Sequence, residues 1–556
     1  MEQSRLLLAI VLSLIIFLAY QFFFAPAPQQ QPAKKAETPA AIQEQPAQDK
    51  DQAQPYVADS ESTGVSPQPA TEVEAPSIAR TITVETPLYE AEISEDGAVI
   101  YSFLLKQYRE SVKKDSALKQ VLTNKKAMGV GHLEFVGKNV AGLDKAVFST
   151  DLAADQLAVN ESTRNLTFLW RSPQGVVIQK TFRFDAASYV VGLDVTVKNG
   201  SGRSIQDRLA ISLNGRTPDD KRLYSFQGPS ALINDELQQI KIKKIKDQNS
   251  FDGKIKWIAI QSRYFMSGLM PDQVDEARLQ LALNSDKFVA AQYQQPENVI
   301  PTGSQYTFKY RLFIGPKKIS YLKSVGNNLE KLIDFGWFDF IARPCLWLLN
   351  LFYSFIPNYG VAIIILTILV KVLLWPLGQK SYKSMSEMKK LQPLMKEIRE
   401  KYKDDKQRMN QEVMGLYKTY KINPLGGCLP MVVQLPVFFA LYRMLYQAIE
   451  LRHAPFFLWI NDLSAPDRLF NFNFSIPFME PPYGIPVLTV IMGASMLLQQ
   501  KMSPPMGDAT QAKMMMFMPI IFTVIFINFS SGLVLYWLVN NILSIAQQYY
   551  TQRKYT

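Results

Sequence analysis

The sequence YGVAIIILTILVKVLLWPL, residues 359–377, decides the fold class. It is an almost unbroken apolar run of about 20 residues, the length that crosses the hydrocarbon core of a bilayer as one helix. Further apolar runs follow at 429–449, 485–500 and 514–550. The last run would be about 55 Å long as one helix, so Ser530-Ser531-Gly532 predicts a break into 514–530 and 531–550. We therefore predict a polytopic α-helical membrane protein with five spans in its C-terminal third.

One charged residue, Lys371, interrupts the first of these runs, six residues before Leu377. At roughly 9 Å inside the helix end, an ionisable residue usually faces a bundle interior or a wet cavity. A lysine near a helix end can also snorkel to the interface, and position alone leaves both interpretations open. Thr367 lies one turn earlier on the same face. The five spans contain no acidic residue, but they do contain the polar residues Gln434, Thr489, Gln499, Asn540 and Asn541. The pattern therefore predicts a hydrated pocket that binds an acidic group of another molecule.

The loops between the spans give the expected orientation. Residues 378–428 carry twelve Lys and Arg against six Asp and Glu, and the positive-inside rule places such a loop in the cytoplasm. The loop 450–484 is not enriched in basic residues and fits the outer side, whereas 501–513 and 551–556 are basic and return to the cytoplasm. With an N-terminal anchor, this pattern predicts six spans and two cytoplasmic termini.

The basic segment 378–428 is itself patterned. Apolar residues recur at helical spacing on both sides of Asp404-Asp405, which predicts an antiparallel helical hairpin. A charge run is usually only a solvated face, but beside a membrane its positive charge also suits anionic lipid headgroups and ribosomal RNA. The candidate contact residues are Lys389, Lys390, Lys396, Arg399, Lys401, Lys403, Lys406 and Arg408.

The N-terminal half has a different character. Residues 1–24 contain an apolar run that predicts an uncleaved transmembrane anchor, although Ala25-Pro26-Ala27 resembles a signal-peptide cleavage site. Residues 25–80 are rich in Pro, Gln and Ala, which predicts a disordered linker. Within 81–325, apolar residues alternate with polar ones, as in Val191, Leu193, Val195 and Val197. This period of two predicts a large antiparallel β-sandwich on the outer side.

Residues 326–358 link the β-domain to the first span. Apolar residues recur at helical spacing over 327–343, with Trp337 and Trp347 as candidate interfacial anchors. This pattern favours an amphipathic helix lying along the membrane surface. The alternative is a helix in the core of the β-domain.

Composition argues against several classes of enzyme. The 556 residues contain two Cys, Cys345 and Cys428, and two His, His132 and His453, and neither pair has the spacing of metal ligands. The two cysteines are expected on opposite faces of the bilayer, which predicts no disulfide between them. The β-domain has one histidine and no cysteine, and no nucleotide-binding G-x-x-x-x-G-K-[ST] occurs. The net charge of +11 indicates an anionic partner. We expect no cofactor, no metal and no catalytic residue.

Over essentially its whole length the chain resembles the YidC membrane-protein insertases of Gram-negative bacteria. The motifs that carry the resemblance are LQP at 391–393, DDKQR at 404–408, NPLGGCLP at 423–430, APFFLWINDLSAPD at 454–467, QKMSP at 500–504 and SGLVLYW at 531–537. The resemblance implies a five-helix core whose groove is open to cytoplasm and lipid, and a periplasmic super-sandwich domain.

The same resemblance implies which residues form the groove. The family's positive residue, commonly arginine, aligns with Lys371, its neighbouring threonine with Thr367, and its final-span aromatic pair with Tyr536-Trp537. Lysine keeps the charge but loses the planar fork of arginine. Trp537 stands where some relatives have tyrosine. The candidate groove residues are Lys371, Thr367, Gln434, Tyr536, Trp537 and Asn540.

These features together predict an insertase and chaperone of the bacterial inner membrane. A polar or acidic tail would be drawn toward Lys371, and the hydrophobic segment would then partition into lipid. The implied partners are nascent inner-membrane proteins, the Sec translocon, the ribosome and anionic lipids. The alternatives are a membrane-anchored periplasmic carbohydrate-binding protein and a secondary transporter.

Overall fold

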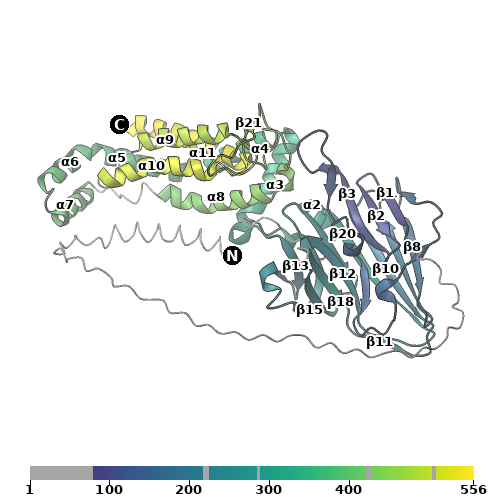
Figure 1. Cartoon of the computed structure of the whole chain (residues 1–556). Coiled ribbons are helices and arrows are strands. Elements are labelled where there is room, and N and C mark those ends of the chain that lie inside the picture. Colours follow the sequence, from purple (N-terminus) through teal and green to yellow (C-terminus); the bar gives the residue numbers. More distant parts are fainter. Residues whose placement is uncertain (1–78, 217–224, 285–287, 421–428, 504–508, 556) are drawn as a thin grey trace, which may run out of the picture. The chain divides into compact units, whose positions relative to one another are not determined.

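The computed structural model describes residues 79–216, 225–284, 288–420, 429–503 and 509–555 (Figure 1). The expected anchor 1–24, nearly all of the linker 25–80 and Cys428 lie outside these residues. One compact unit comprises Ala79–Lys401 and Gln411–Thr556, and it contains both a β-rich part and a helical part. The short segment Tyr402–Asn410 belongs to a second unit.

The β-rich part contains a five-stranded and a thirteen-stranded sheet. The smaller sheet has the order β4-β3-β2-β1-β7 and is antiparallel except where β1 pairs with β7. Its strands are β1 (Thr81–Glu85), β2 (Tyr89–Ser94), β3 (Val99–Arg109), β4 (Leu118–Gln120) and β7 (Gln156–Ala158). In β1 and β2 the more buried residues alternate with less buried ones, as the alternation of apolar and polar residues from Thr81 onward predicts.

The larger sheet is antiparallel, with the order β5-β12-β18-β17-β15-β16-β20-β10-β9-β8-β6 and with β13 and β14 attached at β15. A separate pair is formed by β11 (Ile205–Asp207) and β19 (Asn298–Ile300). The strands of the larger sheet are β5 (His132–Phe135), β6 (Ser149–Thr150), β8 (Arg164–Arg171), β9 (Val176–Phe184), β10 (Val190–Asn199), β12 (Leu209–Arg216), β13 (Gly228–Ile233), β14 (Glu236–Gln239), β15 (Ser250–Gln261), β16 (Phe265–Pro271), β17 (Glu276–Asn284), β18 (Phe288–Gln294) and β20 (Gln305–Pro316).

The register of β10 explains why the alternating pattern was informative. Leu193 lies opposite Tyr310 of β20, and Val195 lies opposite Phe308. All four of these side chains are buried, while intervening residues such as Thr196 are not. A one-residue shift would turn this apolar set to the other face, so the alternation determines the register as well as the strand.

The segment after the β-rich part differs from the expected single amphipathic helix. The helical spacing begins at Asn327, but the chain forms α2 (Ile319–Val325), two short 3-10 turns, and then α3, which begins at Asp339 and ends at Phe355. Asn328 and Gly336 adopt left-handed conformations with φ of 57° and 77°, which interrupt a helix. A side chain at Gly336 would also collide with the Arg443 guanidinium, because a Cβ there would lie 2.1 Å from Nη1.

Burial divides this linking segment into two. Leu329 and Leu332 are buried, as the alternative of core packing requires. Trp337 is 88% exposed and Phe340 is 72% exposed. The first half of the segment therefore packs in a core, and the placement of the second half at a membrane surface stays a prediction.

The helical part consists of eight further helices in the described residues. They are α4 (Tyr359–Leu373), α5 (Trp375–Lys390), α6 (Gln392–Lys401), α7 (Lys406–Thr419), α8 (Leu429–Gln447), α9 (Val487–Met502), α10 (Ala509–Phe526) and α11 (Ser531–Tyr555). The predicted break at 530–532 separates α10 from α11. Helix α11 packs against α4, α5, α8 and α9, and α3 packs against α4 and α8 (Figure 1).

The expected span 359–377 is not one straight helix. Helix α4 ends at Leu373, and α5 leaves it at a bend of 65°. Pro376 lies in the first turn of α5, where a residue without an N–H is tolerated, whereas it would break a continuous helix. Lys371 therefore lies in the last turn of α4, two residues before the helix ends, and not six residues inside a longer helix.

Among the described residues, no single helix is both long and apolar enough to cross a membrane by itself, although the bent pair α4–α5 meets this requirement when taken together.

Candidate functional site

Helix α11 carries a row of polar residues through the middle of the helical part. Asn541, Ser544, Gln547, Gln548 and Thr551 recur every three or four residues, so they share one side of the helix, and all five are buried. Sequence reasoning identified Asn540 and Asn541 but missed Ser544 and the residues beyond it. The spacing of polar residues along an otherwise apolar helix was the signal that could have found them.

Lys371 is connected to this row. Its Nζ donates a hydrogen bond of 2.6 Å to Ser544 Oγ, and Ser544 Oγ donates one of 2.7 Å to the Asn540 carbonyl. The Lys371 side chain is half-buried. Its ammonium therefore meets α11, and within the described residues it forms no ion pair.

Two other helices reach the same row through amides. Gln434 Nε2 of α8 donates to Asn540 Oδ1 at 2.7 Å, and Asn541 Nδ2 donates to Ser495 Oγ of α9 at 3.1 Å. Gln547 Nε2 donates at 2.9 Å to the carbonyl of Trp375, the first residue of α5. Helix α11 thus binds α4, α8 and α9 through neutral polar groups, with one lysine among them.

Thr367 lies one turn before Lys371 in α4 and makes its hydrogen bond within that helix. It is buried, and its Oγ1 donates to the Ile363 carbonyl one turn earlier in α4 at 2.6 Å. This is the back-bonding typical of threonine within a helix. Thr367 is therefore near Lys371 in sequence but is bonded to its own helix.

The aromatic pair lies one turn before Asn540. Tyr536 is buried. Trp537 packs edge-on against Phe438 of α8 and Phe526 of α10, with ring centroids 4.6 and 4.9 Å apart. The polar row therefore adjoins an aromatic cluster that joins α8, α10 and α11.

The helices around Lys371 carry positive charge but no negative charge. Helices α4, α8, α9, α10 and α11 contain no Asp or Glu. A cation among neutral hydrogen-bonding groups in a partly buried site attracts an anion more strongly than the same cation in water would. The arrangement can bind a carboxylate or a polar backbone, but it lacks the paired acid and base that general catalysis needs.

The basic hairpin residues lie on α5, α6, α7 and the connection between α6 and α7. Asp405 directly precedes α7, and its Oδ1 accepts from the Arg408 backbone N–H at 2.9 Å. Lys396 is paired with Glu400 at 3.9 Å, and both side chains are highly exposed. The side chain of Lys406 lies outside the described set. Lys389, Lys390, Lys401, Lys403 and Arg408 are exposed, and Arg399 is half-buried.

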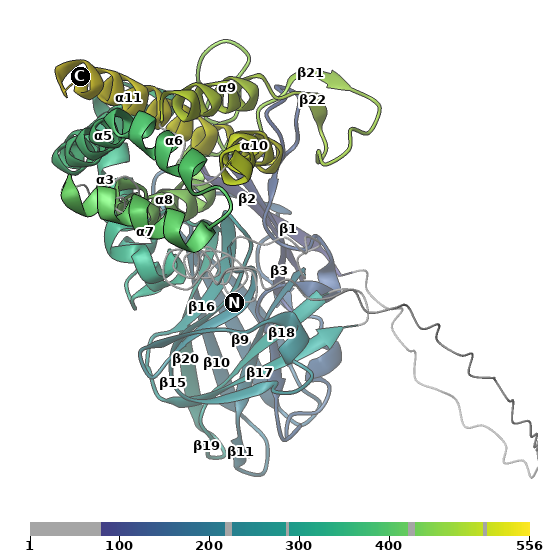
Figure 2. The same ribbon diagram turned by 90° about the vertical axis from the view of Figure 1, so that its left-hand side faces the viewer.

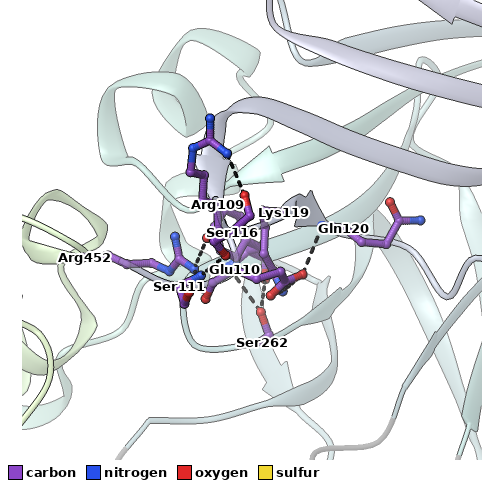
Figure 3. Close-up of polar contacts among 9 residues, drawn as sticks. Arg109, Glu110, Ser111, Ser116, Lys119, Gln120, Ser262 and Arg452 are labelled. Carbon is purple, nitrogen blue, oxygen red and sulfur yellow. Dashed lines mark hydrogen bonds and ion pairs between the residues drawn. The ribbon is translucent and has the colours of Figure 1, made fainter. Parts of the chain in front are cut away.

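The β-rich part and the helical part meet at two arginines. Arg263 stacks on the ring of Tyr446 at 3.6 Å and donates from Nε to the Tyr446 carbonyl at 2.8 Å. Arg452 Nη2 donates to the Arg109 carbonyl at 2.5 Å, at the tip of the β3–β4 hairpin (Figure 3). Sequence reasoning identified neither arginine, because both contacts join residues more than a hundred positions apart.

The β-rich part contains a fully buried lysine, Lys180. Its Nζ donates to the carbonyls of Gly97, Ala98 and Gly131 at 2.8, 2.6 and 2.7 Å. Burial lowers the pKa of Lys180 to about 7. The pKa of His132 is also lowered, by burial first and by the nearby Lys180 second. In the described residues no cluster of three metal-ligating side chains occurs, and Cys345 is a buried free thiol.

Comparison with known proteins gives two family matches. Residues 81–348 match the YidC periplasmic domain, and residues 351–556 match the 60Kd inner membrane protein family. The membrane protein insertase YidC of Syntrophus aciditrophicus is 41% identical over 562 residues, covering 99% of this chain and 99% of that protein. That of Syntrophobacter fumaroxidans is 40% identical over 571 residues, covering 99% of this chain and 100% of that protein.

An active YidC insertase crystal structure with its first transmembrane domain resolved covers 85% of this chain and 95% of its own, at 18% identity and a TM-score of 0.37. A putative aldose 1-epimerase from Escherichia coli K12 covers 42% of this chain and 99% of its own, at 8% identity and a TM-score of 0.30.

Proposed function

The chain belongs to the YidC family of membrane protein insertases, and on this premise we propose that it inserts its clients by holding their polar tails at Lys371. Membership implies an inner-membrane protein with a periplasmic β-rich domain and nascent membrane proteins as substrates. It does not favour a transporter or a carbohydrate-binding protein, and the family is not one of enzymes. What remains to be proposed is how the chain is placed in the membrane and which residues act.

The proposed topology has six spans. They are an N-terminal anchor within residues 1–24, followed by α4, α8, α9, α10 and α11, with both termini in the cytoplasm. The excess of basic residues in 378–428 supports this orientation. Residues 450–484 then lie in the periplasm with the β-domain, and α3 lies at the periplasmic surface.

The observation that carries the mechanism is the hydrogen bond from Lys371 to Ser544 in a set of helices without acidic residues. A client tail that brings a carboxylate to this site would find a cation that forms no ion pair within the described residues. Contact with Lys371, Gln434 and Asn540 replaces part of the water that the tail loses, which lowers the cost of carrying it into a medium of low dielectric. Thr367, Tyr536 and Trp537 would shape the same groove through packing.

Release then needs no nucleotide. The hydrophobic segment of the client moves into lipid beside the apolar faces of α9 and α10, which is favourable by about 0.8 kcal/mol for each buried CH₂ group. The basic hairpin would contact ribosomal RNA and anionic lipid headgroups through its exposed lysines and arginines. The Sec translocon would be a partner for larger clients.

The experiment varies the charge at position 371 and the charge of the client tail together. Lys371→Arg, Lys371→Ala and Lys371→Glu are reconstituted at equal folded amounts, with clients that differ only in an acidic or neutral tail. We expect Lys371→Arg to keep its activity and Lys371→Ala to slow insertion of acidic tails about tenfold, which corresponds to roughly 1.4 kcal/mol. Lys371→Glu should be slowest, since attraction becomes repulsion.

Lys501→Ala is the matched control, because Lys501 is an exposed lysine at the end of α9, another apolar helix. It removes the same charge without touching the polar row. Equal insertion rates for acidic and neutral tails in all the Lys371 variants would refute the electrostatic role.

A further inference from the structure

An exposed aromatic hairpin connects α8 to α9. Its strands are β21 (Leu469–Phe472) and β22 (Tyr483–Ile485), and Figure 2 shows it beside α9 and α10. Phe470, Phe474 and Phe478 are 68%, 63% and 80% exposed. Large aromatic side chains rarely gather on a surface that faces only water.

The surface of this hairpin is almost free of charge. Between Leu469 and Ile485 the sequence contains one ionisable acid or base of unit charge at neutral pH, Glu480. Glu480 is half-buried, and its backbone N–H donates to Asn528 Oδ1 at 2.8 Å. The exposed rings are therefore surrounded by neutral side chains, so few charges would lose their hydration if the rings entered a layer of lipid headgroups.

The base of the hairpin and its connecting loop are both held on the turn between α10 and α11. Asn528 Nδ2 donates to the Phe478 carbonyl at 2.9 Å. Arg468 donates from Nε to the Pro482 carbonyl and from Nη1 to the Ile527 carbonyl, each at 2.8 Å. These bonds hold the hairpin at the end of α10, so its aromatic rings keep a set position relative to that helix.

Helix α10 in turn has an apolar exposed surface. Ile521, Val524 and Ile525, in its last two turns, are 51%, 39% and 50% exposed. In an inner-membrane protein these side chains face lipid. The aromatic surface of the hairpin thus continues a lipid-facing surface beyond the end of the helix.

We propose that this hairpin is a lipid-binding element, whose Phe470, Phe474 and Phe478 enter the boundary between headgroups and acyl chains in the periplasmic leaflet. Apolar side chains of peripheral elements reach roughly 5–10 Å into this boundary. Bound there, the hairpin fixes the depth of α9 and α10 in the bilayer, beside the surface at which clients are released. The inference rests on the proposed function for the periplasmic placement of residues 450–484.

The test places a fluorescent probe on the hairpin of the full-length chain. Phe474→Cys in a Cys345→Ala, Cys428→Ala background is labelled with an environment-sensitive fluorophore and reconstituted in nanodiscs, where both faces are accessible. We expect about a twofold loss of emission with lipids that carry a nitroxide near the top of the acyl chain, and protection from iodide in the water. Lys198→Cys on the exposed face of β10 is the matched control and should show the opposite response.

Topology is read separately from lipid contact. A membrane-impermeant maleimide applied to spheroplasts should label Lys198→Cys, and the labelled Phe474→Cys protein should retain insertion activity. Strong iodide quenching at position 474, in a protein with normal topology and activity, would overturn the inference alone. Protection from both quenchers would also overturn it, because a second protein would then cover the rings. Failure of the maleimide to label Lys198→Cys in spheroplasts would overturn the periplasmic placement and the proposed topology together.

Discussion

The β-rich part and the helical part each contain one notable lysine. In the β-rich part, the Lys180 ammonium is fully buried and donates to three backbone carbonyls. In the helical part, Lys371 is half-buried and donates to one side-chain hydroxyl, that of Ser544. An ammonium has three N–H groups. Lys180 has therefore used its whole donor capacity within the fold, whereas Lys371 has one hydrogen bond within the described residues. Within the described residues, the first lysine therefore has no N–H group left over, whereas two N–H groups of the second make no hydrogen bond.

The two parts also differ in how many large apolar side chains they expose. The most exposed large apolar residues of the helical part include Trp337, Phe355 and Phe478, at 88%, 76% and 80%. In the β-rich part, the corresponding residues are fewer and less exposed, with Val299 at 54% as an example. A protein in water buries its apolar groups and exposes its polar ones. The helical part instead exposes apolar side chains and gathers polar ones along α11, which suits lipid outside and a polar route inside.

Replacing the two lysines should give the largest contrast. Lys180→Met leaves three buried carbonyls unpaired and should destabilise the β-rich part by about 3 kcal/mol, since each unpaired group costs roughly 1–3 kcal/mol and loss of the buried ammonium offsets part of it. Lys371→Met should change stability by less than about 1 kcal/mol, because it removes one partly exposed hydrogen bond. Hydrogen–deuterium exchange of the full chain, compared strand by strand and helix by helix, measures both.

Lys198→Met, an exposed lysine on β10, is the control and should leave exchange unchanged. Equal loss of protection in the Lys180 and Lys371 variants would mean that both lysines are structural, and the proposed role of Lys371 would lose its support.

Separating the two parts should have a smaller effect. Arg263→Ala removes the hydrogen bond to the Tyr446 carbonyl and the stacking on the Tyr446 ring. We expect about 1–3 kcal/mol less stability at this junction, seen as faster exchange near Tyr446 and Ser262 with unchanged strand centres. Arg278→Ala removes an exposed ion pair with Asp252 and should change exchange little. Faster exchange throughout both parts would show that they unfold as one unit.

The smallest expected effect is a dependence on pH. The pKa of Lys180 is about 7 in the fold, against an ordinary value of 10.5. Between these values the unfolded chain binds the proton and the folded chain does not, so stability rises with pH across this window. Lys180→Met lacks the effect, whereas Lys317, whose pKa burial also lowers to about 7, contributes equally to both proteins.

The difference in unfolding free energy between the wild type and Lys180→Met should therefore increase from pH 7 to pH 8. The increase cannot exceed about 1.4 kcal/mol per pH unit for one proton. A difference that is constant or decreases over this range would show that the three carbonyls keep Lys180 charged.

Local pattern accounts for the parts of the fold that the sequence predicted well. The alternation at Val191 to Val197 identified β10, because side chains on a strand alternate between a buried and an exposed face. The break at 530–532 identified the junction of α10 and α11 for a similarly local reason. The bend after Leu373 was missed although Pro376 was visible, because length and hydropathy were judged over the whole run.

The sequence by itself determined the family, the division into a β-rich part and a helical C-terminal part, and the position of one cation in an apolar helix, because composition, periodicity and motifs are properties of neighbouring residues. Only the tertiary structure decided which groups meet that cation. Ser544 lies 173 positions from Lys371, and Arg263 lies 183 positions from Tyr446. Contacts at such separation depend on how whole helices and sheets pack, and no local pattern in a single sequence encodes them.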